Sequence, residues 1–429
     1  MFQFIYSLLF PIFFLCYLPF YLVHIIRRGG LTKEYWERLG IIGSDKKRRL
    51  KELKRPVWIH AVSVGETIAA LTFIKAWQAK FPQDDLVFSC STSTAFHTAK
   101  AKLPENVMLI YCPIDCFFAV RRTLKVVRPI MLVIFEVEIW PNLICCAKSI
   151  GAKVALVNGR MSDRSSRGYA KWAFIFKPLF DKFDSICVQT AEDRKRICRV
   201  LGDDPRVVVC DTMKFDQVPE TKNADKSQVL DDCFGSGERL VFTAGSTHSG
   251  EEELVCRAYI QLKSEHPELK MILVPRHCER APEVGKLLDS MGLTYRLSKP
   301  DEHAKADTRI VDVLLANTTG ELMNFYGASD IAYVGKSLAG QTGGHNIIEP
   351  AIFGKAILHG SHMENFRQVA SLFKEAQASV EVEQDDDFLP SLRKLVEDSG
   401  EREAMGRRAR GLVDRYRGAI ERTLNQLEH

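Results

Sequence analysis

Short apolar segments alternate with stretches of helical periodicity along most of the chain, and this alternation constrains the fold more than any other feature. The segment at residues 57–60 is apolar, and after the turn at 63–66 the apolar residues recur at helical spacing. The segments of the same kind that follow are 86–90, 107–111, 130–135, 154–157, 185–189 and 207–210. Apolar strands that alternate with helices are typical of a parallel sheet covered by helices on both faces. The sequence therefore predicts an α/β fold with a doubly wound sheet.

A polar segment at residues 216–227 interrupts this pattern, which then starts again. The further strand candidates are 240–244, 271–274, 309–313, 330–334, 356–358 and 379–382. A chain of 429 residues is long enough for two domains. We therefore expect two α/β domains that face each other across a cleft. Their predicted bounds are 29–215 and 228–400, with a linker at 216–227 and a C-terminal helix at 401–429.

The N-terminus is strongly apolar. Residues 2–26 contain no aspartate, glutamate, lysine or arginine, and such a stretch is long enough to span a bilayer as a helix. Pro11 and Pro19 would kink that helix, so a shallow insertion remains an alternative. Arg27 and Arg28 place the rest of the chain in the cytoplasm by the positive-inside rule. Residues 1–28 are therefore predicted to anchor the protein in a membrane.

Charge and cysteine content exclude other classes of protein. The net charge of +5 is too small to indicate a nucleic-acid partner. Basic residues are concentrated at 46–55, where an anionic membrane surface is the natural partner. The 12 cysteines show neither a disulfide nor a zinc spacing, which indicates a reducing compartment.

Acidic residues follow two strands of the predicted first domain. Glu66 lies at the start of the first helix, where it either stabilises the helix N-terminus or acts as a general base. Glu136 and Glu138 follow the strand at 130–135, where they form either a polar substrate site or a salt-bridge network. Arginines that bind an anion or simply lie on the surface are Arg160, Arg164 and Arg167.

The first two strands of the second domain also end in polar residues. Ser246 and Thr247 are part of a loop that either presents backbone N–H groups to a phosphate or begins a helix capped by Ser249 and Glu252. Arg276 follows the second strand, where it either holds a phosphate or carboxylate or forms a surface salt bridge.

A glycine-rich turn is the strongest local signal. Gly343 and Gly344 permit close approach of a ligand to the backbone, and Asn346 can cap a helix whose N-terminus favours a phosphate. Glu349 either accepts hydrogen bonds from a ribose or closes a capping box. The spacing differs from the dinucleotide fingerprint, so no NAD is inferred. The three aspartates at 385–387 are interpreted as a solvated helix start, and no metal is assigned.

Taken together, these stretches resemble the 3-deoxy-D-manno-octulosonic acid (Kdo) transferases of Gram-negative lipopolysaccharide synthesis. The resemblance covers nearly the whole chain, and the matching motifs occur in the same order as in the family. The matching pieces are HAVSVGE at 60–66, EVEIWPN at 136–142, NGRMSDRS at 158–165, MKFD at 213–216, GSTHSGEE at 245–252, VPRHCER at 274–280, TGELMNFYGASDIAYVG at 319–335 and GGHNIIEP at 343–350.

The resemblance implies a GT-B architecture of two Rossmann-like domains, with CMP-Kdo bound by the C-terminal one and a lipid A precursor (lipid IVA) met by the N-terminal one. It implies inverting transfer without a metal, with Glu66 as general base and Glu136 as a second important acid. The residues that it implies for the nucleotide are Ser246, Thr247, Arg276, His277, Gly344, His345, Asn346 and Glu349. The family usually carries glycine where this chain has Asp211 and Lys336. Two rival hypotheses are a GT-B transferase or epimerase specific for a UDP-sugar, and a membrane-bound sugar-nucleotide sensor without activity.

Overall fold

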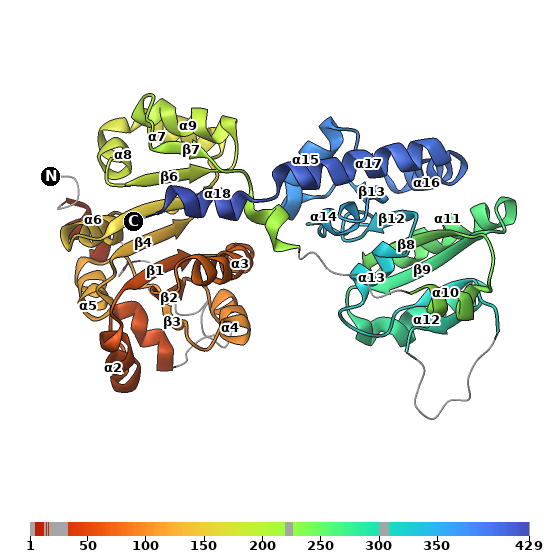
Figure 1. Cartoon of the computed structure of the whole chain (residues 1–429), viewed down its shortest axis with the longest axis horizontal. Helices are drawn as coiled ribbons and strands as arrows, with labels where there is room; N and C mark the ends of the chain where they lie inside the picture. Colours follow the sequence, from red (N-terminus) through yellow and green to blue (C-terminus); the bar gives the residue numbers. More distant parts are fainter. Residues whose placement is uncertain are drawn as a thin grey trace. The chain divides into compact units, whose positions relative to one another are not determined.

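The structure is a computed structural model that describes residues 5–12, 14, 16, 33–218, 226–299 and 309–428. The chain divides into two compact units (Figure 1). The first unit consists of Met1–Gln217 and Arg417–His429, and the second consists of Val218–Tyr416. Each unit is built around a parallel seven-stranded sheet, which confirms the predicted α/β class.

The sheet of the first unit has the strand order β3-β2-β1-β4-β5-β6-β7. Its strands are β1 (Pro56–Ala61), β2 (Asp85–Cys90), β3 (Met108–Tyr111), β4 (Met131–Phe135), β5 (Lys153–Gly159), β6 (Ser185–Val188) and β7 (Val207–Val209). All seven were expected from their apolar segments. The direction in which strands are added reverses between β1 and β4, and ligands bind at such a point in sheets of this type.

Helices cover both faces of this sheet, because the side chains of each strand alternate between two cores. Trp58 of β1 packs in one core, whereas Val57 and Ile59 pack in the other. Helices of the first core are α2 (Ser44–Glu52), α5 (Phe117–Val127), α6 (Pro141–Ser149), α8 (Ala173–Phe180) and α9 (Ala191–Leu201). Those of the second are α3 (Val64–Lys80), α4 (Ser93–Lys102) and α18 (Ala419–Gln426). The other helical segments are η1 (Lys33–Leu39), α7 (Asp163–Lys171) and η2 (Met213–Gln217).

The sheet of the second unit has the order β10-β11-β9-β8-β12-β13-β14, with its reversal between β8 and β12. Its strands are β8 (Leu240–Thr247), β9 (Leu269–Pro275), β10 (Tyr295–Leu297), β11 (Val313–Leu315), β12 (Ile331–Val334), β13 (Ala356–Gly360) and β14 (Val380–Val382). The sequence missed β10, a short strand with a central arginine. It also placed β11 too early, because Val311 is buried under α10 (Ser227–Phe234) rather than in the sheet.

The remaining helical segments of the second unit surround this sheet. They are α11 (Glu251–Glu265), η3 (Cys278–Arg280), α12 (Ala281–Ser290), α13 (Leu322–Gly327), α14 (Ile348–Ala351), η4 (Glu364–Phe366), α15 (Arg367–Glu375), η5 (Asp385–Asp387), α16 (Phe388–Glu397) and α17 (Ser399–Tyr416).

The C-terminal segment forms two helices where the sequence predicts one. Gly418 adopts a left-handed conformation with φ 83° between α17 and α18. The carboxylate of Asp216 then accepts hydrogen bonds from the backbone N–H groups of Gly418 and Ile420, both at 2.7 Å. Figure 1 shows α18, in blue, among the elements of the first unit, where it packs on α3 and η2.

Only part of the predicted N-terminal anchor belongs to the described residues. Residues 5–12 are helical, and the Ser7 hydroxyl donates a hydrogen bond of 2.6 Å to Asn142 Oδ1 in α6. No helix among the described residues is both long and apolar enough to cross a membrane. The anchor predicted at 1–28 otherwise lies outside the described residues.

Candidate active site

The turn between β1 and α3 places Glu66 at the edge of the first sheet. Ser63 is the N-cap of α3, and its hydroxyl accepts a 3.2 Å hydrogen bond from the Glu66 N–H. In return, the Glu66 carboxylate accepts hydrogen bonds from Val62 N at 2.9 Å and Ser63 N at 3.2 Å. This reciprocal capping box confirms that Glu66 stabilises the helix start. Its role as a general base stays a prediction.

Glu136 follows β4, the neighbour of β1 in the sheet, so the strand order brings the two predicted acids to the same edge. Its backbone is left-handed, with φ 55°, and its N–H donates to Val157 O at 2.9 Å. Such a conformation costs a residue with a side chain about 1–2 kcal/mol, and strain of this kind is concentrated at functional sites.

The surroundings of Glu136 oppose its ionisation. Burial raises the pKa of Glu136 to about 7, and the negative charge of Glu66 adds to the rise, whereas Arg160 and Lys214 oppose it. Burial also raises the pKa of Glu138 to about 7, again with a contribution from Glu66. Three carboxyl groups therefore influence one another at this edge, and carboxyl groups with a pKa near neutrality are suited to proton transfer.

Lys214 is a residue of this cluster to which the sequence assigned no role. Burial lowers the pKa of Lys214 to about 8, and Arg160 lowers it further, while Glu136 opposes the change. The sequence feature that could have identified Lys214 is its position between two apolar residues, Met213 and Phe215, which are both fully buried in η2. Arg160 is exposed but close enough to act on both groups, whereas Arg164 and Arg167 lie exposed on α7.

In the second unit, the loops after β8 and β9 meet. Ser246 is left-handed, with φ 55°, and the carbonyl of Thr247 accepts a 2.9 Å hydrogen bond from the backbone N–H of Arg276. The predicted capping by Ser249 and Glu252 is wrong, because α11 begins after Gly250, whose φ is 93°. The Glu252 carboxylate instead pairs with Arg280 at 2.7 Å.

Glu251 connects the loops after β8 and β12, a role that was not expected from the sequence. The side chain is fully buried, and its carboxylate accepts a 2.7 Å hydrogen bond from the Tyr333 hydroxyl. The backbone N–H groups that it also accepts from are those of His248 (2.9 Å), Lys336 (2.8 Å), Ser337 (2.9 Å) and Leu338 (3.2 Å). One carboxylate thus holds both loops at the point where the strand order reverses.

Three imidazoles gather at this edge. The Nε2 atoms of His248 and His345 are 3.0 Å apart, and the His277 ring lies edge-on to His248, with 6.1 Å between centroids. Burial lowers the pKa of His345 to about 3, and His248, Arg276 and Lys336 lower it further. Burial also lowers the pKa of His248. The pair is therefore neutral at pH 7, with one ring donating an N–H to the other.

The glycine-rich turn lies beside the histidines and is tightly packed. Gly343 and Gly344 have φ values of 112° and 66°, and a Cβ on Gly344 would collide with Met363. Asn346 accepts a 3.1 Å hydrogen bond from Ile348 N, but the N-cap of α14 is Ile347, so the prediction that Asn346 caps this helix is wrong. In addition, α14 has only four residues, so the expected dipole at its N-terminus is small.

Glu349 is partly buried and Tyr326 is fully buried next to this turn. Burial raises the pKa of Glu349 to about 7, against the opposing effects of Arg276 and Asn346. The Tyr326 hydroxyl is fully buried close to Gly245 and has no hydrogen-bond partner among the described residues. The sequence assigned no role to Tyr326, although it lies in the stretch at 319–335.

The two positions where glycine was expected are both left-handed. Asp211 has φ 67° and pairs with Arg422 at 2.9 Å, and Lys336 has φ 65° at the end of β12. Glycine adopts this conformation without steric penalty, which explains the expectation. Lys336 adds a cation to the sheet edge at which the three imidazoles gather.

Comparison with known proteins decides the family. A family profile described as 3-deoxy-D-manno-octulosonic-acid transferase (kdotransferase) matches residues 33–217. The 3-deoxy-D-manno-octulosonic acid transferase of Haemophilus influenzae is 30% identical over 373 residues, which cover 87% of this chain and 86% of that protein. The chain belongs to the Kdo transferase family. It is therefore a glycosyltransferase, and the resemblance seen in the motifs is confirmed.

Two further comparisons agree with this assignment. The Kdo transferase of Bordetella pertussis is 30% identical over 421 residues, and the match covers 94% of both proteins. The structure of UDP-GlcNAc 2-epimerase from Neisseria meningitidis bound to UDP-GlcNAc matches with a TM-score of 0.54 and 11% identity, covering 87% of this chain and 99% of that one. At this identity the likeness shows the fold alone, which is the GT-B-like pair of parallel α/β sheets.

Proposed function

We propose that this Kdo transferase moves Kdo from CMP-Kdo to a hydroxyl of a lipid A precursor, lipid IVA, with inversion at the anomeric carbon. The observation that carries the proposal is the pair Glu66 and Glu136 at the ends of neighbouring strands, where burial and mutual repulsion raise the pKa of Glu136 to about 7. We place the enzyme at the inner membrane with its two α/β units in the cytoplasm, on the basis of the apolar residues 2–26 and the arginines that follow.

Glu66 is proposed to take the proton of the acceptor hydroxyl as the glycosidic bond forms. Each of its oxygens accepts one backbone N–H, which fixes the carboxylate and leaves lone pairs for the substrate. With a pKa of about 7, Glu136 is protonated for about half of the time at neutral pH. A protonated Glu136 avoids a second negative charge beside Glu66.

The second unit is proposed to bind CMP-Kdo through the residues at the reversal point of its sheet. Arg276 and Lys336 supply positive charge for the phosphate and the sugar carboxylate, while the neutral imidazoles offer hydrogen bonds. Stabilising the negative charge on departing CMP lowers the barrier to transfer. The residues proposed for the donor are Ser246, Thr247, Arg276, His277, Gly344, His345, Asn346 and Glu349.

The proposal includes no metal held by the aspartates of η5. The Asp385 carboxylate accepts a hydrogen bond from Ala339 N at 2.9 Å, and Asp387 forms a capping box with Gln384. These carboxylates therefore stabilise a loop and a helix start, as the sequence predicted for them.

The test is an incubation of the purified full chain with CMP-Kdo and lipid IVA, analysed by mass spectrometry. We expect lipid IVA to gain the mass of one or more Kdo units, and the product masses also count the transfers. Parallel reactions contain UDP-sugars in place of CMP-Kdo. Transfer from a UDP-sugar alone, or binding of CMP-Kdo without any product, would contradict the proposal.

A further inference from the structure

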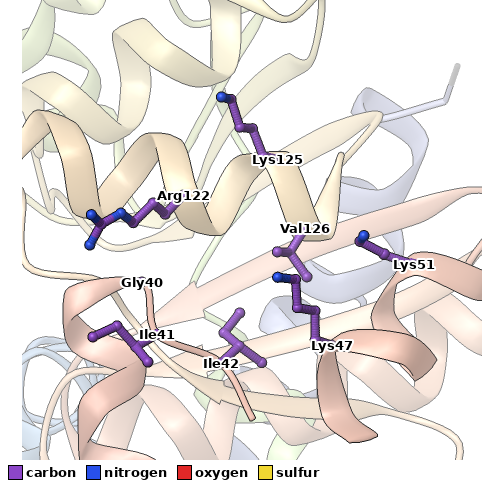
Figure 2. Close-up of a pocket in the computed structure, with 8 residues that line it drawn as sticks. All are labelled: Gly40, Ile41, Ile42, Lys47, Lys51, Arg122, Lys125 and Val126. Carbon is purple, nitrogen blue, oxygen red and sulfur yellow. The ribbon is translucent and has the colours of Figure 1, made fainter. Parts of the chain in front are cut away.

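A basic pocket in the first unit lies on the helix face formed by α2 and α5. Figure 2 shows Lys47 and Lys51 from α2 on one side and Arg122 and Lys125 from α5 on the other, with Ile41 in the loop before α2. The pocket has a volume of about 450 Å³. All four cationic residues are exposed, and none forms an ion pair with another described residue. No acidic residue is among the described residues that line the pocket.

The backbone that forms one wall of this pocket is held in place. Gly40 is left-handed with φ 72°, and a Cβ there would lie 2.6 Å from Ala119 O, so only glycine lets the loop pack directly on α5. Lys46 does not line the pocket and instead pairs with the buried Glu37. The basic run at 46–55 is therefore divided: Lys46 supports the fold, whereas Lys47 and Lys51 supply unpaired charge.

The positive surface continues past α5. A second pocket of about 430 Å³ is lined by Arg121, Lys125 and Arg128, again without an acidic residue among the described ones. Concave sites with charges of one sign concentrate ions of the opposite sign. A phosphate group is a common biological anion that lysine and arginine side chains bind through charge-assisted hydrogen bonds.

Apolar residues on α5 and on neighbouring elements point to a membrane as the source of that phosphate. Phe118 at the start of α5 is 70% exposed, and Trp36 in η1 is 60% exposed. The helical residues 5–12 contact α6 beside α5 through Ser7 and Asn142, and they expose Leu8 and Leu9. Exposed aromatic and aliphatic side chains next to cations are typical of a surface that lies on an anionic bilayer.

We propose that the pocket formed by Lys47, Lys51, Arg122 and Lys125 binds the phosphate of an anionic phospholipid headgroup in the membrane that carries the acceptor. The inference rests on the proposed function insofar as that function requires a membrane-bound acceptor. It assigns to the α2–α5 face a lipid contact that is separate from the carboxylates at the sheet edge.

The test is lysine footprinting of the full chain, with trace acetylation measured by mass spectrometry. Samples contain vesicles of phosphatidylcholine, either pure or mixed with phosphatidylglycerol, at the same ionic strength. We expect the anionic vesicles to slow labelling of Lys47, Lys51 and Lys125 roughly fivefold. Control lysines in the same sample are Lys75, Lys100 and Lys102, on the opposite face of the sheet, and their labelling should change little.

A variant tests whether the protection of Lys47 comes from the pocket itself, because the N-terminal segment is the same in every protein compared. In the triple variant Lys51→Ala, Arg122→Ala, Lys125→Ala, the remaining Lys47 should be labelled equally on both vesicles. The matched variant Lys75→Ala, Lys100→Ala, Lys102→Ala removes the same charge and should keep the protection of Lys47. The mutated side chains are exposed in both cases, so the fold is preserved.

Two outcomes would overturn the proposal. One is equal labelling of the pocket lysines on neutral and anionic vesicles. The other is equal protection by inorganic phosphate with neutral vesicles, which would show a site for the free anion instead of a headgroup. Neither donor nor acceptor is present, so these results do not depend on whether the protein transfers Kdo.

Discussion

The two units share a sheet architecture but differ in the chemistry at its reversal point. In the first unit, side-chain carboxylates follow neighbouring strands, and burial raises the pKa of Glu136 and Glu138 to about 7. In the second, the corresponding edge carries neutral imidazoles, Arg276, Lys336 and a glycine-rich turn.

This difference separates two tasks. A cluster of acids that share negative charge can accept and release a proton near neutral pH. In the second unit, Arg276, Lys336 and neutral imidazoles beside a glycine-rich turn are suited to holding an anion, although burial also raises the pKa of Glu349 there to about 7. The comparison therefore predicts that mutations in the first unit lower the turnover number, whereas mutations in the second weaken donor binding.

The largest effect is expected for Glu66→Gln. Loss of the base should lower kcat about 10²–10⁴-fold while CMP binding, measured by calorimetry, stays unchanged. The matched control is Ser63→Ala, which breaks the other half of the capping box and costs about 1 kcal/mol of stability. Ser63→Ala should retain activity within a few-fold, and a Glu66→Gln enzyme with near-normal kcat would show that Glu66 only caps the helix.

Arg276→Ala should have the next largest effect, on the donor side. Removal of this cation should raise the KM for CMP-Kdo roughly 10–100-fold, because a charge-assisted hydrogen bond to an anion is lost. Arg257→Ala is the control, since Arg257 lies exposed on α11 and pairs with Glu253. An unchanged KM in the Arg276 variant would show that Arg276 does not bind the anionic groups of the donor.

Glu136→Gln should change stability in a pH-dependent way. A carboxyl whose pKa is raised from 4.5 to about 7 favours the folded state below pH 4.5 and loses that contribution as the pH rises through 7. Glutamine stays neutral, so the variant should gain about 1–3 kcal/mol over the parent at pH 8 and almost nothing at pH 4. Denaturant unfolding at both pH values measures this.

The control for that experiment is Glu105→Gln, at an exposed position, which should show no such pH dependence. Equal unfolding free energies of parent and Glu136→Gln at pH 8 would mean that the carboxyl is solvated, and the contrast between the two sheet edges would weaken.

Lys336→Gly should give the smallest effect, and it should increase stability while weakening donor binding. Glycine relieves the left-handed strain, so the variant should be more stable by about 0.5–1 kcal/mol. Loss of the cation should raise the KM for CMP-Kdo a few-fold. Asp211→Gly relieves similar strain in the first unit and should leave this KM unchanged. A Lys336→Gly enzyme with an unaltered KM would exclude a role in donor binding.

Much of the fold could be predicted because its signals are local. Apolar runs and helical spacing located all seven strands of the first sheet and the position of Glu66 at a helix start. The prediction failed where the local signal was weak or misleading: β10 contains a central arginine, and Val311 is apolar but lies outside the sheet. The effect of the α14 N-terminus on a phosphate was overestimated, because the sequence pattern could not show that this helix has only four residues.

The candidate site was predictable as a set of residues but not as a set of interactions. Glu251 resembled any acid in the first turn of a helix, yet it accepts hydrogen bonds from nearby His248 and from Lys336, which is 85 residues away in the sequence. Lys214 and Tyr326 lie in recognised motifs, but their burial depends on elements distant in the chain.

The sequence by itself determined the order of strands and helices, the two-sheet architecture and membership of the Kdo transferase family. These properties depend on backbone periodicity and on residue types at neighbouring positions. Only the tertiary structure decided which charges meet: Glu66 with Glu136, His248 with His345, and Lys47 and Lys51 with Arg122 and Lys125. The physical reason is that a pKa or an electrostatic pocket depends on desolvation and distance, which strands and helices far apart in sequence create only when they pack together.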